Sequence, residues 1–324
     1  MARDVSTDAS GRARRRGVLT RAPRFSRSER LSYAFLAPSL LVFALIMGYP
    51  FVQGLAYSFR GGSLLALGGF VGLDNYSQLL QDPEFQNAVV FTAVFTIGTV
   101  AGSYLIGLGL ALLLNAEIAG RGVLRGALLI PWIIPSIVST QSFRWLLEPQ
   151  NGPVDALLQH LGFQPIPFFA TPAWATFTVT LVKVWRSYPF MMVSCLAALQ
   201  TIDPNLGEAA AVDGAGKTAW FKHIAWPHIA TLSIVMWIMM AIFSIHDFET
   251  IWLLTQGGPG FATENLMVLS YKYTFIVQNV GLGSAAAIVS LVVLMALAVL
   301  LLRSRPDQAV VAVGPGAATR PGAL

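Results

Sequence analysis

Six long apolar stretches, separated by short polar loops, dominate the sequence. Each is long enough to cross the hydrocarbon layer of a bilayer, which needs about 20 residues in a helix. Because no water reaches that layer, backbone groups there must bond to one another, and a helix satisfies all of them. The expected spans are Tyr33–Phe59, Ala88–Leu114, Val123–Leu147, Ala173–Leu199, Trp226–Leu254 and Phe275–Leu302. We therefore predict an all-α membrane protein with six transmembrane helices.

Composition excludes other protein classes. Of the 324 residues, 55% are hydrophobic and 11% are charged, whereas soluble domains carry about 25% charged residues. A soluble globular enzyme and a disordered chain are both excluded by these values. With Cys195 as the single cysteine and four scattered histidines, an internal disulfide is impossible, and we expect no metal site and no cofactor.

Basic residues indicate the orientation in the membrane. Residues 1–31 contain nine arginines, which suit either a nucleic-acid-binding arm or a cytoplasmic tail that follows the positive-inside rule. We favour the tail and expect no nucleic acid partner, because most other Lys and Arg residues fall in alternate loops. The prediction is a multi-pass protein of the cytoplasmic (cell inner) membrane with both termini cytoplasmic. Residues 1–31 and 304–324 would be disordered tails, and residues 32–303 the six-helix domain.

Small residues recur in two of the expected spans. The second contains Gly98, Gly102, Gly107 and Gly109, and the sixth contains Gly281 and Gly283 followed by Ser284 and Ala285–Ala287. Small side chains allow helix backbones to approach closely in a membrane. These positions are either helix contacts or lipid-facing filler.

The loop 200–227 joins the fourth and fifth spans. Asp203 or Asn205 can cap a helix that opens at Pro204, and the alanines after Glu208 favour that helix. Gly214 then allows a sharp turn. We predict a short helix, a turn and a second short helix exposed to the cytosol, without catalytic side chains.

One segment of this loop has the pattern of a nucleotide site. Ala211–Thr218 ends in Gly-Lys-Thr, as phosphate-binding loops do. A working phosphate loop follows a buried strand in a parallel sheet, and helix-forming residues precede this one. We therefore expect no nucleotide on this chain.

The 200–227 loop resembles the EAA loop of ABC importer permeases, in which EAA-x-x-DGA is followed by F-x-x-I-x-LP. The matching residues are Glu208, Ala209, Ala210, Asp213, Gly214, Ala215, Phe221, Ile224 and Pro227. Trp226 stands where the family usually has Leu. Three further segments, Phe70–Tyr76, Trp185–Phe190 and Leu254–Pro259, resemble motifs of the maltose type of sugar permease.

This resemblance implies a type I importer fold and a non-catalytic pore subunit. Expected partners are a cytoplasmic ABC ATPase dimer, a second homologous permease and an extracytoplasmic solute-binding protein, besides membrane lipid and a sugar substrate. The ATPase would dock on Glu208, Ala209, Ala210, Asp213, Gly214 and Ala215.

Charged residues inside the spans suggest where the solute passes. Lys183 and Arg186 lie near mid-membrane, where a charge costs about 2.5–3.5 kcal/mol on insertion scales, so both should face the bundle interior or water. Asp247 or Glu249 could be their counter-ion, either to fix helix packing or to contact solute. The family resemblance places the sugar among Arg186, Ser187, Phe190, Phe243, Ser244 and Asp247.

Two other functions fit parts of the sequence less well. An ion-coupled secondary transporter is the alternative, because internal groups such as Asp247 and His246 would suit it. Six spans without an internal repeat, joined by a docking loop, argue against a complete carrier. An intramembrane enzyme would need a paired nucleophile and base or a metal motif, and the sequence offers neither.

Overall fold

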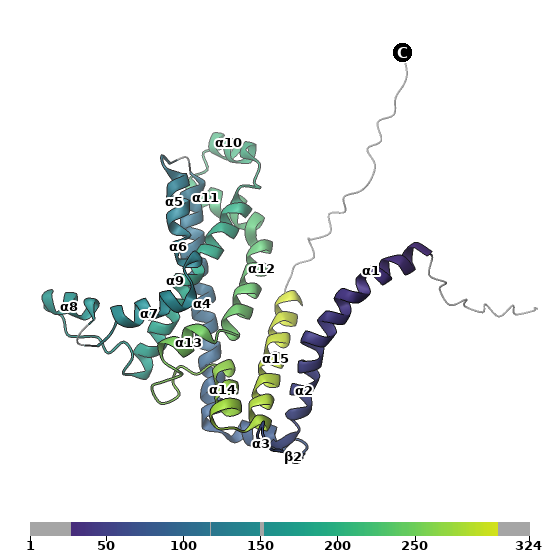
Figure 1. The fold of residues 1–324 in the computed structure, drawn as a ribbon. Helices are drawn as coiled ribbons and strands as arrows, with labels where there is room; N and C mark the ends of the chain where they lie inside the picture. Colours follow the sequence, from purple (N-terminus) through teal and green to yellow (C-terminus); the bar gives the residue numbers. More distant parts are fainter. Residues whose placement is uncertain (1–26, 117, 150–151, 304–324) are drawn as a thin grey trace, which may run out of the picture. The chain divides into compact units, whose positions relative to one another are not determined.

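Figure 1 shows the computed structural model, which describes residues 27–116, 118–149 and 152–303. The chain divides into two units, up to Val52 and from Gln53 onward. The first contains helix α1 (Arg27–Phe43) and the π-helical turn η1 (Ala44–Gly48), which α2 (Tyr49–Tyr57) continues. The predicted tails lie outside the described residues, except that residues 27–31 belong to α1.

The second unit begins with a hairpin and ends with a long helix. Strands β1 (Arg60–Gly62) and β2 (Leu67–Phe70) pair in antiparallel fashion. The following elements are α3 (Asp74–Gln81), α4 (Pro83–Asn115), α5 (Arg121–Leu128), α6 (Ile130–Ile133), α7 (Ser136–Leu146), α8 (Pro153–His160), α9 (Pro172–Leu199), α10 (Pro204–Val212), α11 (Lys217–Trp220), η2 (Phe221–Ala225), α12 (Trp226–Ile245), α13 (Glu249–Leu254), α14 (Leu266–Tyr271), η3 (Lys272–Ile276) and α15 (Val280–Arg303).

Four helical segments of the described residues are long and apolar enough to cross a membrane: Phe35–Tyr57, Pro83–Asn115, Lys217–Ile245 and Val280–Leu300. They confirm the first and second expected spans and correct the limits of the fifth and sixth. The fourth expected span is α9, a continuous helix of 28 residues. It is less apolar than the other four because Lys183 and Arg186 interrupt its sequence.

The third expected span is not one continuous helix. Its two parts, Arg121–Ile133 and Ser136–Leu146, meet at 89°. Pro135 lies at the break, where its ring and missing N–H prevent the helix from continuing, and Ile134 before it has extended backbone angles. This proline explains why the prediction of a single helix is wrong.

The fifth expected span ends nine residues earlier than predicted. Helix α12 stops at Ile245, and α13 forms a separate helix. The side-chain amide of buried Asn265 donates to the carbonyls of Ile245 (3.3 Å) and Asp247 (2.8 Å). Because these last carbonyls have a partner outside the helix, the chain can leave the helical path without leaving them unpaired.

The sixth expected span begins five residues later than predicted. The segment from Phe275 to Ile276 belongs to η3, and Gln278 turns the chain with a φ of +58° before α15 starts at Val280. The side chain of Asn279 accepts a hydrogen bond from the N–H of Leu282 at 3.0 Å, which satisfies a donor at the start of α15.

Helices α4 and α9 pack closely along a row of glycines. A Cβ atom would lie 2.9 Å from Thr180 Cγ2 at Gly98, 2.8 Å from Val184 Cγ2 at Gly102 and 2.6 Å from Met191 Cβ at Gly107. At Gly281 and Gly283 it would overlap the Arg60 carbonyl and the Thr274 hydroxyl. These five glycines are close contacts, whereas Gly109 faces open space and fits the other reading, that of filler.

The largest hydrophobic core joins α4, α9 and α12. It contains Tyr104, Met191, Met192, Cys195, Ile229 and Met236, all nearly inaccessible to solvent. Figure 1 shows α10 at one end of these helices and α3 and α14 at the opposite end. Two regions of this unit carry the predicted site residues: the 200–227 loop at the α10 end and a cavity beside α9 and α12.

Candidate functional site

The 200–227 loop has the helix–turn–helix form that its residues predict. Asp203 caps α10 by accepting a hydrogen bond from the N–H of Asn205 at 2.9 Å. Gly214 adopts a φ of +78°, a left-handed conformation that strongly favours glycine. The N–H of Ala215 donates to the Ala210 carbonyl at 2.9 Å and closes the turn.

The tip of this loop is exposed while its base is anchored. The side chains of Glu208, Ala209 and Asp213 are exposed, and Ala210 and Ala215 are half-buried. Buried Ile202 and half-buried Trp220, Phe221 and Ile224 pack on the core of α4, α9 and α12. The anchored base makes the loop a rigid link between α9 and α12.

Two apolar side chains are exposed on α10. Val212 is 88% exposed and Leu206 is 49% exposed. Exposed apolar side chains beside a carboxylate on a firmly held helix are a suitable surface for another protein.

A cavity of about 750 Å³ lies between α6, α9, α12, α13 and α14. Its lining residues are Trp132, Lys183, Arg186, Ser187, Phe190, Met240, Phe243, His246, Asp247, Phe248, Glu249, Met267 and Tyr271. Five of the six predicted path residues are among them. The sixth, Ser244, is fully buried, and its hydroxyl donates to the Met240 carbonyl at 2.8 Å.

The charged groups of the cavity are held in a specific arrangement. Lys183 Nζ lies 2.7 Å from Asp247 Oδ2, and these side chains are 13% and 5% exposed. Asp247 Oδ1 accepts the backbone N–H of Thr250 at 3.0 Å, and Arg186 Nη1 donates to the Thr250 hydroxyl at 3.2 Å. Asp247 is therefore the counter-ion of Lys183, as one of the predicted pairings proposed.

An aromatic wall completes the cavity. The Trp132 and Phe190 rings are 6.2 Å apart, and the Phe190 and Phe243 rings are 6.4 Å apart in an edge-to-face arrangement. They come from α6, α9 and α12. Sequence reasoning missed Trp132 as a lining residue, because its position depends on the 89° break that follows α6.

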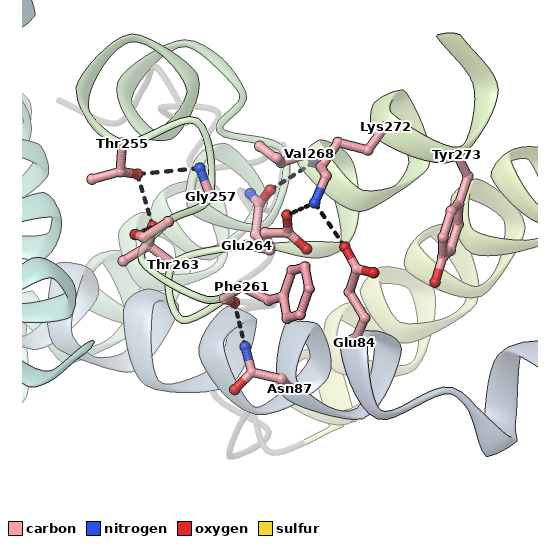
Figure 2. A network of polar contacts seen from close by, with 12 residues as sticks. Glu84, Asn87, Thr255, Gly257, Phe261, Thr263, Glu264, Val268, Lys272 and Tyr273 are labelled. Atoms are coloured by element: carbon pink, nitrogen blue, oxygen red, sulfur yellow. Dashed lines mark hydrogen bonds and ion pairs between the residues drawn. The ribbon is translucent and has the colours of Figure 1, made fainter. Parts of the chain in front are cut away.

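A second polar network lies at the end of the bundle opposite α10 (Figure 2). Lys272 on η3 contacts Glu84 on α4 at 2.7 Å and also Glu264. Its ammonium lies 5.0 Å from the centre of the Phe261 ring. The network ties the start of α4, the loop after α13 and η3 together.

Burial controls the ionisation of this network. Glu264 is 1% exposed, and loss of solvent raises the pKa of its carboxyl to about 7. Glu84 adds to this rise, while the hydrogen bond and positive charge of Lys272 oppose it, and the pKa of about 7 is the net result. Two carboxylates share one ammonium here, so the site favours a proton on Glu264.

Comparison with known proteins gives consistent matches. Residues 103–308 match the family described as binding-protein-dependent transport system inner membrane component. The chain is 34% identical to the trehalose/maltose transport system permease protein MalF of Thermococcus litoralis, over 86% of this chain and 94% of that protein. It is 35% identical to the sulfoquinovosyl glycerol transport system permease protein SmoG of Agrobacterium fabrum, over 84% and 89%.

The fold matches a solved structure. A chain in the crystal structure of a bacterial alginate ABC transporter, in complex with an alginate pentasaccharide-bound periplasmic protein, superposes with a TM-score of 0.75 at 22% identity. The match covers 85% of the present chain and 93% of the other. At this identity the comparison establishes the fold.

Proposed function

This chain belongs to the binding-protein-dependent transport system inner membrane components, which are the non-catalytic, multi-pass permease subunits of ABC transporters, and from this premise we propose that it carries a sugar through the membrane. The solute would pass through the cavity beside α9, and a partner ATPase would drive transport through the 200–227 loop. The family sets aside the ion-coupled carrier considered as the alternative.

One observation carries the coupling proposal: the 200–227 loop connects α9, which supplies Lys183, Arg186 and Ser187 to the cavity, with α12, which leads directly into Asp247. Helix α9 ends at Leu199, and the helix that contains α12 starts at Lys217. A partner that moves the loop therefore moves Arg186 and Asp247 relative to each other. The exposed side chains of Glu208 and Val212 would meet the ATPase.

The cavity lining supports a sugar as the solute. Aromatic rings stack on the apolar faces of sugar rings, while charged and hydroxyl groups bond to sugar hydroxyls. Trp132, Phe190 and Phe243 supply the rings, and Lys183, Arg186 and Asp247 supply the polar groups. The relatives named above are permeases of trehalose/maltose and sulfoquinovosyl glycerol systems, which agrees with this class.

We propose the same set of partners that the sequence implies: an ATPase dimer on the 200–227 loop, a second permease beside this one and an extracytoplasmic binding protein at the opposite end. The loop would lie in the cytoplasm together with both termini. In support, α5, which contains Arg121 and Arg125, and α11, which begins at Lys217, lie toward the α10 end of the bundle (Figure 1), as the positive-inside rule requires.

The docking proposal can be tested by changing Glu208 and Gly214. We expect Glu208→Lys to abolish ATPase co-purification and solute-stimulated ATP hydrolysis while the chain still inserts in the membrane. Gly214→Ala should weaken both, because alanine in the left-handed region costs about 1–2 kcal/mol. Gly216→Ala is the matched control, since Gly216 has a φ of −71° and open space around it. Undiminished co-purification in Glu208→Lys would refute the docking role.

The orientation can be tested with a single new thiol. Cys195 is fully buried, so a cysteine at the exposed position in Val212→Cys would be the accessible thiol among the described residues. An impermeant maleimide should label it in inside-out vesicles and leave it unlabelled in right-side-out vesicles. The reverse pattern would overturn the proposed topology.

A further inference from the structure

The guanidinium of Arg186 has unused hydrogen-bonding capacity inside the cavity. Nη1 donates to the Thr250 hydroxyl, and Nε is buried without any hydrogen-bond partner among the described residues. Those residues also place no carboxylate within ion-pair distance of Arg186, whereas Lys183, three positions earlier, is paired with Asp247. Among the described residues, Lys183 therefore has a counter-ion and Arg186 has none.

A cation left without a counter-ion in a partly buried position is destabilising, so an anionic ligand is favoured beside Arg186, which lines the cavity. With Nη1 bonded to Thr250 and Nε shielded from solvent, Nη2 is the remaining donor of the guanidinium. Its N–H groups, together with the positive charge, suit an oxygen of a carboxylate or related oxyanion. A neutral hydroxyl can accept from Nη2 but does not neutralise the charge.

The other ionisable groups of the cavity do not neutralise Arg186. The side chain of Glu249 is exposed, and its carboxylate accepts a hydrogen bond from Ser136 on α7. His246 is also exposed, with Nδ1 lying 3.3 Å from the Ile242 carbonyl. Asp247 is engaged by Lys183 and by the N–H of Thr250.

From this geometry we propose that the solute is an acidic sugar, whose carboxylate or sulfonate binds Nη2 of Arg186. The aromatic wall of Trp132, Phe190 and Phe243 holds the apolar face of the ring, and Arg186 sets the specificity for the acid. This inference rests on the proposed sugar transport and adds the chemical class of the substrate.

The test measures how strongly acidic and neutral sugars bind to the permease–ATPase complex in nanodiscs. The probes are glucuronate and 6-sulfonated glucose, each compared with glucose, and galacturonate compared with galactose. Isothermal calorimetry gives the ratio of neutral to acidic Kd for each pair. A charge-assisted hydrogen bond predicts a ratio of about ten to one hundred in favour of one acid.

Variants of Arg186 identify the group responsible. Arg186→Gln should bring the ratio to about one. Arg186→Lys should give an intermediate ratio, because lysine keeps the charge and loses the fork. Arg144→Gln is the control, since Arg144 lies outside the cavity and its Nη1 donates to the Leu253 carbonyl. Thermal unfolding, reported by exposure of Cys195, shows that each variant is folded.

The outcomes separate this inference from the proposed function. Neutral sugars that bind as well as acidic ones would overturn the acidic class and leave sugar transport standing. A preference for acid that survives in Arg186→Gln would remove the assigned role of Arg186. If no sugar binds, the proposed function fails, and this inference fails with it.

Discussion

The network around Glu264 predicts that the folded chain loses stability as the pH rises from acidic to neutral. The folded state holds a proton on Glu264 up to about pH 7, because burial and Glu84 disfavour its charged form. An unfolded chain releases that proton near its ordinary pKa of 4.5. Between these values the folded state binds more protons, so the free energy of unfolding falls with rising pH.

The size of this loss follows from the shift. An increase from 4.5 to about 7 corresponds to roughly 3 kcal/mol. The loss should be complete slightly above pH 7, with no further change from this group. Since about 1 kcal/mol moves the Tm of a chain of a few hundred residues by about 2–4 °C, the Tm should fall on the order of 5–10 °C between pH 5 and pH 8.

The chain supplies its own reporter for this measurement. Cys195 is the single cysteine and is fully buried, so a fluorogenic maleimide reacts when the helices separate. The Tm is recorded at several pH values for the wild type and for Glu264→Gln, which keeps an acceptor for Lys272. The difference between the two curves isolates Glu264 from other titrating groups.

Variants of the neighbouring charged residues should shift the pH at which the decline in Tm ends. Glu84→Gln removes a negative neighbour, so the decline should end at a lower pH than in the wild type. Lys272→Met removes the group that lowers the pKa of Glu264, so the decline should extend to a higher pH. Asp82 and Tyr273, bonded to each other beside this network, stay unchanged in every variant. Parallel wild-type and Glu264→Gln curves from pH 5 to pH 8 would refute the reasoning.

Two further predictions use the same assay. Gly107→Leu should prevent folding or lower the Tm strongly, because a Cβ there already lies 2.6 Å from Met191 Cβ. The control is Gly109→Leu on the same helix, where the new side chain meets open space. An equal Tm for the two variants would contradict the packing argument. Lys183→Met or Asp247→Leu alone should cost about 3–5 kcal/mol by leaving a buried charge unpaired. The double variant should recover most of this loss, and purely additive losses would show that the pair is not coupled.

The features predicted best from the sequence are those that depend on residues close together in the chain. The apolarity of α4 and the extent of α9 follow from consecutive residues. Helix α9 begins one residue before its expected range and ends with it, and α4 contains its expected range but begins at Pro83. The cap at Asp203 and the turn at Gly214 are equally local, since the bonds involved join residues a few positions apart. Such features do not depend on where the rest of the chain lies.

The break in the third expected span could have been predicted from its two prolines. Pro131 and Pro135 stand four positions apart within one apolar stretch. Pro131 is accommodated at the start of α6, where its missing N–H would be unpaired in any case. Pro135 stands at the N-cap of α7, and α6 ends before it because a proline disfavours the helical conformation of the residue that precedes it. Attention to proline position would have predicted the break, although not its 89° angle.

The cavity depends on contacts that no local pattern contains. Asn265 ends α12 by bonding to the carbonyls of Ile245 and Asp247, about 20 positions earlier in the chain, and it also caps α14 by accepting from the N–H of Val268 at 2.9 Å. Without knowledge of this contact with Asn265, the sequence up to Leu254 therefore predicts a helix longer than α12. The break leaves Asp247 at the end of α12 rather than within a helical turn, where it meets Lys183 on α9. Because Lys183 takes that carboxylate, Arg186 has no carboxylate partner among the described residues. The buried amide of Asn265 thus helps to determine which cation of α9 is available to a solute, and this could not be inferred from the spacing of charges alone.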